Sequence, residues 1–231
     1  MTLYTDRYIL FTVNEKSVVK QTIMTKALLL FSEKGYEGVP VSELTEAAGI
    51  TKPTLYYYFG SKEGVFEAVC QSYYSRLNAA ITEKAVYNPK PHAYFEDINL
   101  TLTKVTAAYF SFARANEAFF RIVLANMSMP CSSPVFKIVE NYHFAQFDII
   151  EGMFRNMAKV HGNLRGKSRI LTWSFIGTIN SYISLGFNGF AAGEGRPATR
   201  EWPDKTAGHT PALNDKTVKE LVHQFMHGIY A

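Results

Sequence analysis

The chain has 231 residues, of which 47% are apolar and 14% aromatic, so it can bury a substantial core. Its formal net charge is +4, but residues 1–65 carry seven basic and seven acidic side chains, so overall charge does not by itself predict nucleic-acid binding. No apolar run approaches the ~18 residues of a membrane span, and Cys70 and Cys131 lack metal-ligand spacing, which favours reduced thiols in a cytoplasmic protein.

The N-terminal residues 1–16 leave several alternatives open. They contain a short apolar run at residues 8–13 that favours a strand. The segment is an ordered arm reaching DNA, a helical extension, sequence upstream of the natural start, or a loosely packed terminus. As an arm it would have Arg7 as its only basic residue before Lys16. Residues 17–34 then show helical periodicity, which Gly35 ends.

A helix-turn-helix is predicted from residue 41 onward. Residues 41–48 form a short helical pattern, and Gly49 supplies a turn with positive φ at no steric cost. Thr51 can cap a second helix, and Pro53 falls in its first turn, where a missing N–H costs little. This unit places its second helix in the DNA major groove.

The second helix has an unusual surface. Leu55 and Phe59 are four residues apart and are predicted to face the core. Residues 56–58 are consecutive tyrosines, about 100° apart around a helix, so at least two must face outward. Tyrosines beside Lys52, Thr54 and Lys62 suit phosphate oxygens and base edges. The alternative is one core tyrosine and two incidental surface ones.

Residues 49–59 read Gly-Ile-Thr-Lys-Pro-Thr-Leu-Tyr-Tyr-Tyr-Phe and are followed by Ser-Lys-Glu at 61–63. This stretch resembles the signature of the TetR family of bacterial transcriptional regulators, and residues 27–36 resemble that family's first helix and exit turn. The specific match covers roughly residues 23–69. The resemblance implies an all-α fold, with a three-helix DNA-binding domain at residues 17–62 and a ligand-binding and dimerisation domain at 63–231.

The resemblance also implies a role for each polar or exposed residue of the motif. Pro53 and Tyr56 would approach bases through apolar contact, and Lys52 would contact bases or phosphates. Ser42 would lie near the groove edge. The residues that would hold phosphates are Thr51, Thr54, Tyr57, Tyr58 and Lys62. Two positions depart from the family pattern, because Pro40 replaces a Ser or Thr cap and Thr45 replaces a small Ala.

The rest of the chain is helical by pattern, which gives about nine helices in all. Residues 193–213 contain three glycines and three prolines and predict a long loop. The predicted helices after the motif are residues 61–86, 93–115, 117–127, 135–160, 168–192 and 215–229.

The last two helices are predicted to form a homodimer. Residues 171–190 and 218–229 carry apolar side chains over much of their surface. In the family the corresponding helices pair across a twofold axis as a four-helix bundle. A charge at Leu221 or Phe225 is then expected to dissociate the dimer. The alternative is that these helices form the centre of a monomeric core.

The middle helices are crowded with aromatic residues, which predicts a small-molecule site for an apolar or aromatic effector. The alternative is that these rings simply pack the core. The candidate ligand-binding residues are Tyr109, Phe112, His143, Phe147, Trp173 and Asn180.

No catalytic constellation is evident, so we expect neither an enzyme nor a cofactor. His223 and His227 have the spacing of metal ligands, but Gln224 stands where a zinc protease needs Glu, so we expect no metal. We therefore predict a repressor that a small ligand releases from an inverted-repeat operator in double-stranded DNA. The alternatives are an architectural or localisation factor whose C-terminal half binds a protein, and an enzyme with a DNA-binding head.

Overall fold

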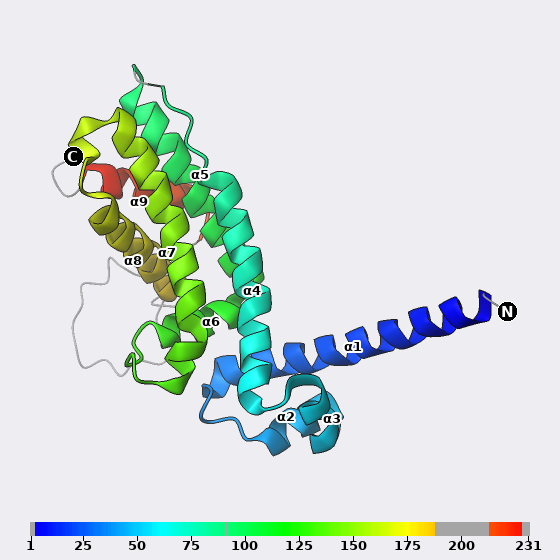
Figure 1. The fold of residues 1–231 in the computed structure, drawn as a ribbon. Coiled ribbons are helices and arrows are strands. Elements are labelled where there is room, and N and C mark those ends of the chain that lie inside the picture. The colour runs from blue at the N-terminus through cyan, green and yellow to red at the C-terminus, as the bar shows by residue number, and fades with distance from the viewer. Residues whose placement is uncertain (1–2, 91, 188–212, 228–231) are drawn as a thin grey trace, which may run out of the picture. The chain divides into compact units, whose positions relative to one another are not determined.

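The computed structural model describes residues 3–90, 92–187 and 213–227, and within these ranges it contains helices and no strand (Figure 1). The predicted all-α fold is confirmed. The α-helices are α1 (Leu3–Lys34), α2 (Val41–Ala48), α3 (Lys52–Phe59), α4 (Lys62–Lys84), α5 (Tyr94–Ala115), α6 (Glu117–Asn126), α7 (Pro134–Val160), α8 (Ser168–Phe187) and α9 (Asp215–His227). A short 3-10 turn, Gly162–Leu164, follows α7.

Helix boundaries agree with the sequence periodicity except at the N-terminus. Helix α1 begins at Leu3 rather than at residue 17, so the first residues continue the helix. This corresponds to the helical extension among the alternatives. The predicted loop at 193–212 and the expected helical residues 188–192 and 228–229 lie outside the described residues.

The chain folds into two compact units, and helices α4 and α7 each run from one unit into the other. The first unit extends to Ser75 and includes Ala118–Tyr142, and the second comprises Arg76–Glu117 and the described residues from His143 onward. The functional division into residues 17–62 and 63–231 stays a prediction.

Aromatic rings form the centre of the first unit. The Phe66 ring, from α4, packs edge-on against Phe31 from α1 and against Tyr36 from the following turn, with ring centres 5.3 and 5.1 Å apart. Further along α4, Tyr74 stacks on Tyr142 and packs edge-on against Phe119. Apolar burial of this kind is the main stabilising contribution, and it fixes α4 against α1.

The second unit has its own core between α7, α8 and α9. Phe154, Phe175 and Phe225 come from these three helices, with ring centres 5.1 to 6.1 Å apart. Leu221 on α9 is fully buried. Leu221 therefore packs inside the protomer, and the expectation that a charge at Leu221 would act by dissociating a dimer is wrong. A charge at Leu221 would instead destabilise this core. Phe225 is half-buried, so the same expectation for Phe225 stays a prediction.

Candidate nucleic-acid interface

The turn between α2 and α3 has the predicted geometry. Gly49 ends α2 with φ of 64°, and the Ile50 N–H donates to the Thr45 carbonyl over 3.0 Å. Thr51 caps α3, because its hydroxyl accepts from the Thr54 N–H at 3.4 Å, and Pro53 lies in the first turn. These local interactions fix the direction in which α3 leaves the turn.

Both departures from the family pattern are accommodated locally. Pro40 is the N-cap residue of α2 and provides no side-chain cap. Glu43, which lacks a capping-box partner, forms an ion pair with Lys34 at the end of α1. Thr45 is buried, and its hydroxyl donates to the Ser42 carbonyl at 2.8 Å, so no buried polar group is left unsatisfied there.

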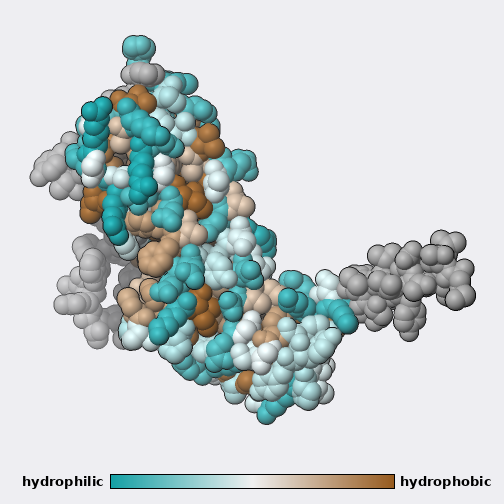
Figure 2. Space-filling view, in the orientation of Figure 1, coloured by the Kyte–Doolittle hydropathy of each residue, from teal (hydrophilic) through white to brown (hydrophobic). Residues whose placement is uncertain are grey.

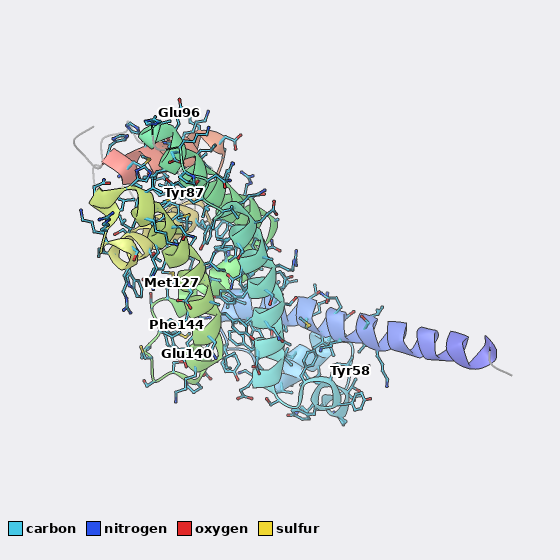
Figure 3. All side chains as sticks on the ribbon, turned by 45° about the horizontal axis from the view of Figure 1, so that its top comes forward. Tyr58, Tyr87, Glu96, Met127, Glu140 and Phe144 are labelled. Carbon is cyan, nitrogen blue, oxygen red and sulfur yellow. The ribbon has the colours of Figure 1, made fainter. Side chains whose placement is uncertain are left out.

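Helix α3 presents tyrosine to the surface. Leu55 is fully buried, whereas Phe59 is only half-buried, so a single residue anchors α3 in the core. Tyr56 is 46% exposed and Tyr57 is 70% exposed. This agrees with the expectation that at least two of three consecutive tyrosines on a helix face outward. Tyr58, labelled in Figure 3, is half-buried. Its ring packs edge-on against Tyr57, with ring centres 5.2 Å apart.

All nine predicted DNA-binding residues lie in the first unit, on α2, on α3 with its N-cap Thr51, and at the start of α4. Ser42, Thr51, Lys52, Pro53, Tyr56 and Tyr57 are exposed, and Thr54, Tyr58 and Lys62 are half-buried. The Lys62 ammonium lies 4.2 Å from the centre of the Tyr36 ring, a favourable cation–π contact. Their contacts with DNA stay predictions.

The structure adds two basic residues that the sequence analysis did not identify. Lys16 on α1 donates to the Tyr57 hydroxyl oxygen at 3.4 Å, and its ammonium is 5.9 Å from the Tyr57 ring centre. One turn later, the Lys20 ammonium lies 5.7 Å from the Phe59 ring centre. Their four-residue spacing was visible in the sequence, but nothing there showed that this side of α1 reaches α3.

Close packing joins the end of α3 to the start of α4. Ser61 caps α4 by accepting from the Gly64 N–H at 3.1 Å. A Cβ at position 64 would lie 1.9 Å from the Phe59 carbonyl oxygen, so only glycine fits there. Helix α4 therefore starts in a fixed position behind α3.

The six predicted ligand-binding residues all lie in the second unit but in different surroundings. Tyr109 and Asn180 are buried, while Trp173 is 59% exposed and packs on Phe147 with ring centres 4.9 Å apart. His143 is half-buried, and burial lowers its pKa. Phe112 lines a groove, and the other five residues do not. Their role in ligand binding stays a prediction.

This groove lies between the second half of α4 and the last turns of α5 and has a volume of about 750 Å³. All its lining residues belong to the second unit. The residues from α4 and the segment after it are Arg76, Ala80, Glu83, Lys84, Val86 and Asn88, and those from α5 and its C-cap are Lys104, Ala107, Ala108, Ser111, Phe112, Ala115 and Asn116.

Two further features bear on other kinds of function. The His223 and His227 rings on α9 are 4.6 Å apart, but the described part of the chain brings no third His, Cys, Asp or Glu to them. None of the described helices is both long and apolar enough to cross a membrane.

The fold and this site define the class of helix-turn-helix DNA-binding proteins. Residues 23–69 match the family model of bacterial regulatory proteins, tetR family. This match identifies residues 23–69 as a DNA-binding domain of the type found in the bacterial transcriptional regulators of the TetR family.

Among curated relatives, the IcaR negative transcriptional regulator of the biofilm operon icaADBC from Staphylococcus aureus (strain Newman) is 36% identical over 63 residues. That match covers 27% of this chain and 34% of the relative, so the chain spans about a third of the length of this relative.

Solved structures resemble the chain over most of its length. A Clostridium perfringens putative fatty acid metabolism regulator superposes with a TM-score of 0.67 at 21% identity, covering 90% of this chain and 98% of that one. The Bacillus subtilis transcriptional regulator FadR, in complex with stearoyl-CoA, gives 0.68 at 15% identity, with coverage of 90% and 98%. At these identities the likeness concerns the fold.

Proposed function

We propose that the protein is a cytoplasmic transcriptional repressor that binds an inverted-repeat operator as a homodimer and leaves it when a small ligand binds. The observation that carries this proposal is the surface of α3. Exposed Tyr56 and Tyr57 stand beside Lys52 on a helix without acidic residues, and a capped turn fixes its direction. Two such helices related by a twofold axis would meet half-sites about 10 bp apart.

Individual residues would have different roles in DNA binding. Pro53 and Tyr56 would make apolar contacts with bases, while Thr51, Thr54, Tyr57, Tyr58 and Lys62 would hold phosphates. Lys16 and Lys20 supply positive charge beside α3, which helps to explain how a domain of zero net charge binds a polyanion.

An acyl-coenzyme A type of effector is supported by two of the structural neighbours, one a putative fatty acid metabolism regulator and one bound to stearoyl-CoA. Helix α4 offers the route of coupling, because it begins at Lys62 beside α3 and continues into the second unit. To lower the affinity for DNA a hundredfold, the ligand must bind the released state of the protein more tightly than the DNA-binding state by about 2.7 kcal/mol.

The test is to recover genomic DNA fragments retained by the purified protein and to measure their binding by fluorescence anisotropy. We expect an enriched fragment with an inverted repeat. Tyr56→Ala should change which bases are preferred, because it removes the apolar ring, whereas the matched Tyr56→Phe keeps the ring and should keep the preference. If the wild-type protein enriches no fragment over a column without protein, the proposed function is wrong.

A further inference from the structure

The groove between α4 and α5 exists because small side chains line its middle. A volume of about 750 Å³ lies within the usual range of small-molecule sites. Larger side chains at these positions would fill the space between the two helices. The small residues of the floor are Ala80, Ala107, Ala108, Ser111 and Ala115.

Basic residues mark the two ends of this groove. The Arg76 guanidinium lies 5.8 Å from the Phe112 ring centre, which places these residues opposite each other. Lys84 is eight residues further along α4, and Lys104 is eight residues back along α5. Helices α4 and α5 are consecutive and run in opposite directions (Figure 1), so both lysines mark the same end, about 12 Å from Arg76.

The charge balance of the lining favours an anion. Over the whole lining three cations stand against a single acid, Glu83, and at the end that holds Lys84 and Lys104 two cations stand against that acid. The Glu83 carboxylate is 2.7 Å from the Lys84 ammonium, but its side chain is 71% exposed. An exposed pair of this kind is weak, so an anionic ligand can compete with Glu83 for Lys84.

We propose that this groove, rather than the aromatic core, is the effector site, and that it takes an acyl thioester of the coenzyme A type. The phosphates lie between Lys84 and Lys104, the amide-bearing arm follows the small-residue floor, and the acyl end lies toward Phe112. Several phosphates suit two lysines at one end of a groove better than a single carboxylate does. This assignment rests on the proposed regulatory function and identifies its ligand site.

The position of the groove also connects the ligand to DNA binding. About half of the lining comes from α4 and the residues just after it, and α4 begins beside the recognition helix. A ligand that binds one placement of α4 better than another shifts the population toward it. Operator DNA must then weaken thioester binding by the same factor by which the thioester weakens DNA binding.

The experiment is calorimetric titration of the full-length protein with palmitoyl-CoA, free coenzyme A and palmitate, each kept below its critical micelle concentration. Lys104→Glu reverses a charge at the phosphate end, and Ala108→Trp fills the floor without changing charge. Lys167→Glu is the matched control, because Lys167 is an exposed lysine of the same unit outside the groove. Helical circular dichroism confirms that each variant is folded.

We expect Lys104→Glu to weaken the binding of palmitoyl-CoA and of coenzyme A by about tenfold or more, and to weaken the binding of palmitate less. Ala108→Trp should weaken the binding of palmitoyl-CoA to a similar degree. Lys167→Glu should leave the affinities for all three ligands unchanged. Equal binding of palmitoyl-CoA by the wild type and both groove variants would place the ligand elsewhere and overturn the inference. A wild type that retains operator DNA but binds no thioester would also overturn it, while leaving the proposed function intact.

Discussion

Asp97 is a buried acid with several hydrogen-bond partners. Its Oδ2 atom accepts from the Tyr87 hydroxyl at 2.6 Å and from the Lys90 N–H at 2.8 Å, and His161 Nε2 lies 3.3 Å away. Burial alone would raise the pKa of Asp97, but these hydrogen bonds outweigh it and hold the pKa below its ordinary value. The cluster joins the start of α5 to the residues after α4 and α7.

This arrangement predicts a pH-dependent contribution to stability. Because the pKa of Asp97 is lower in the folded state, its contribution is present above the unfolded pKa of about 3.9 and is lost as pH falls through the folded value. Asp97→Asn should lower the free energy of unfolding by about 1–3 kcal/mol at pH 7. The difference in this free energy between the wild type and the variant should narrow below pH 4. Urea denaturation of the wild type and the variant at pH 7 and at pH 3 measures this difference.

Asp148→Asn is the control for this prediction, because Asp148 is exposed and its substitution should have little effect at either pH. If Asp97→Asn lowers the free energy of unfolding equally at pH 7 and at pH 3, the charge of the carboxylate contributes nothing to stability.

The residue scale also shows what the sequence could and could not predict. The outward tyrosines of α3 followed from consecutive positions on one helix, and the Thr51 cap followed from its place after Gly49. Both depend on neighbours along the chain. The cluster of Asp97 with His161 joins residues 64 positions apart, so no local pattern predicts it. The contacts of Phe225 with Phe154 on α7 and Phe175 on α8 were not predictable for the same reason.

At the scale of elements, α1 shows how context overrides local propensity. Residues 8–13 favour a strand by composition, yet they continue a helix. Extending an existing helix adds a hydrogen bond per residue and requires no new nucleus, so a weak β preference is overcome. The ends of α2 to α7 and the starts of α8 and α9 were predicted more closely, because glycines, prolines and capping residues mark most of them.

The position of α1 predicts that its lysines contribute to DNA binding. Lys16→Ala with Lys20→Ala should weaken binding to all sequences alike, because both ammonium groups lie beside α3 and would contact phosphates. Losing two phosphate contacts should reduce the salt slope by about 1.8 units. Lys26→Ala is the matched control, an exposed lysine further along α1. An unchanged slope in the double variant would mean that these lysines only position Tyr57 and Phe59.

At the scale of the whole molecule, α8 has apolar residues on two faces. Its inner face buries Phe175, Ile179 and Ile183 in the protomer, whereas Ile170 and Trp173 on its outer face are 62% and 59% exposed. Figure 2 shows apolar residues among hydrophilic ones on the face of the molecule that it draws. Two large apolar side chains exposed on one face of a helix suit an interaction site. The outer face of α8 is therefore the surface on which we expect the homodimer to form.

This assignment predicts which substitution dissociates the dimer. Trp173→Glu replaces a ring that is 59% exposed in the protomer with a carboxylate, so the fold should survive while dimerisation weakens by at least tenfold. Leu221→Glu should instead unfold the protomer, because Leu221 is fully buried. Sedimentation velocity should show about twice the 26.1 kDa chain mass for the wild type and the single-chain mass for Trp173→Glu. Leu100→Glu, on an exposed apolar residue of α5, is the control. Dissociation by Leu100→Glu but not by Trp173→Glu would place the interface on α5 instead.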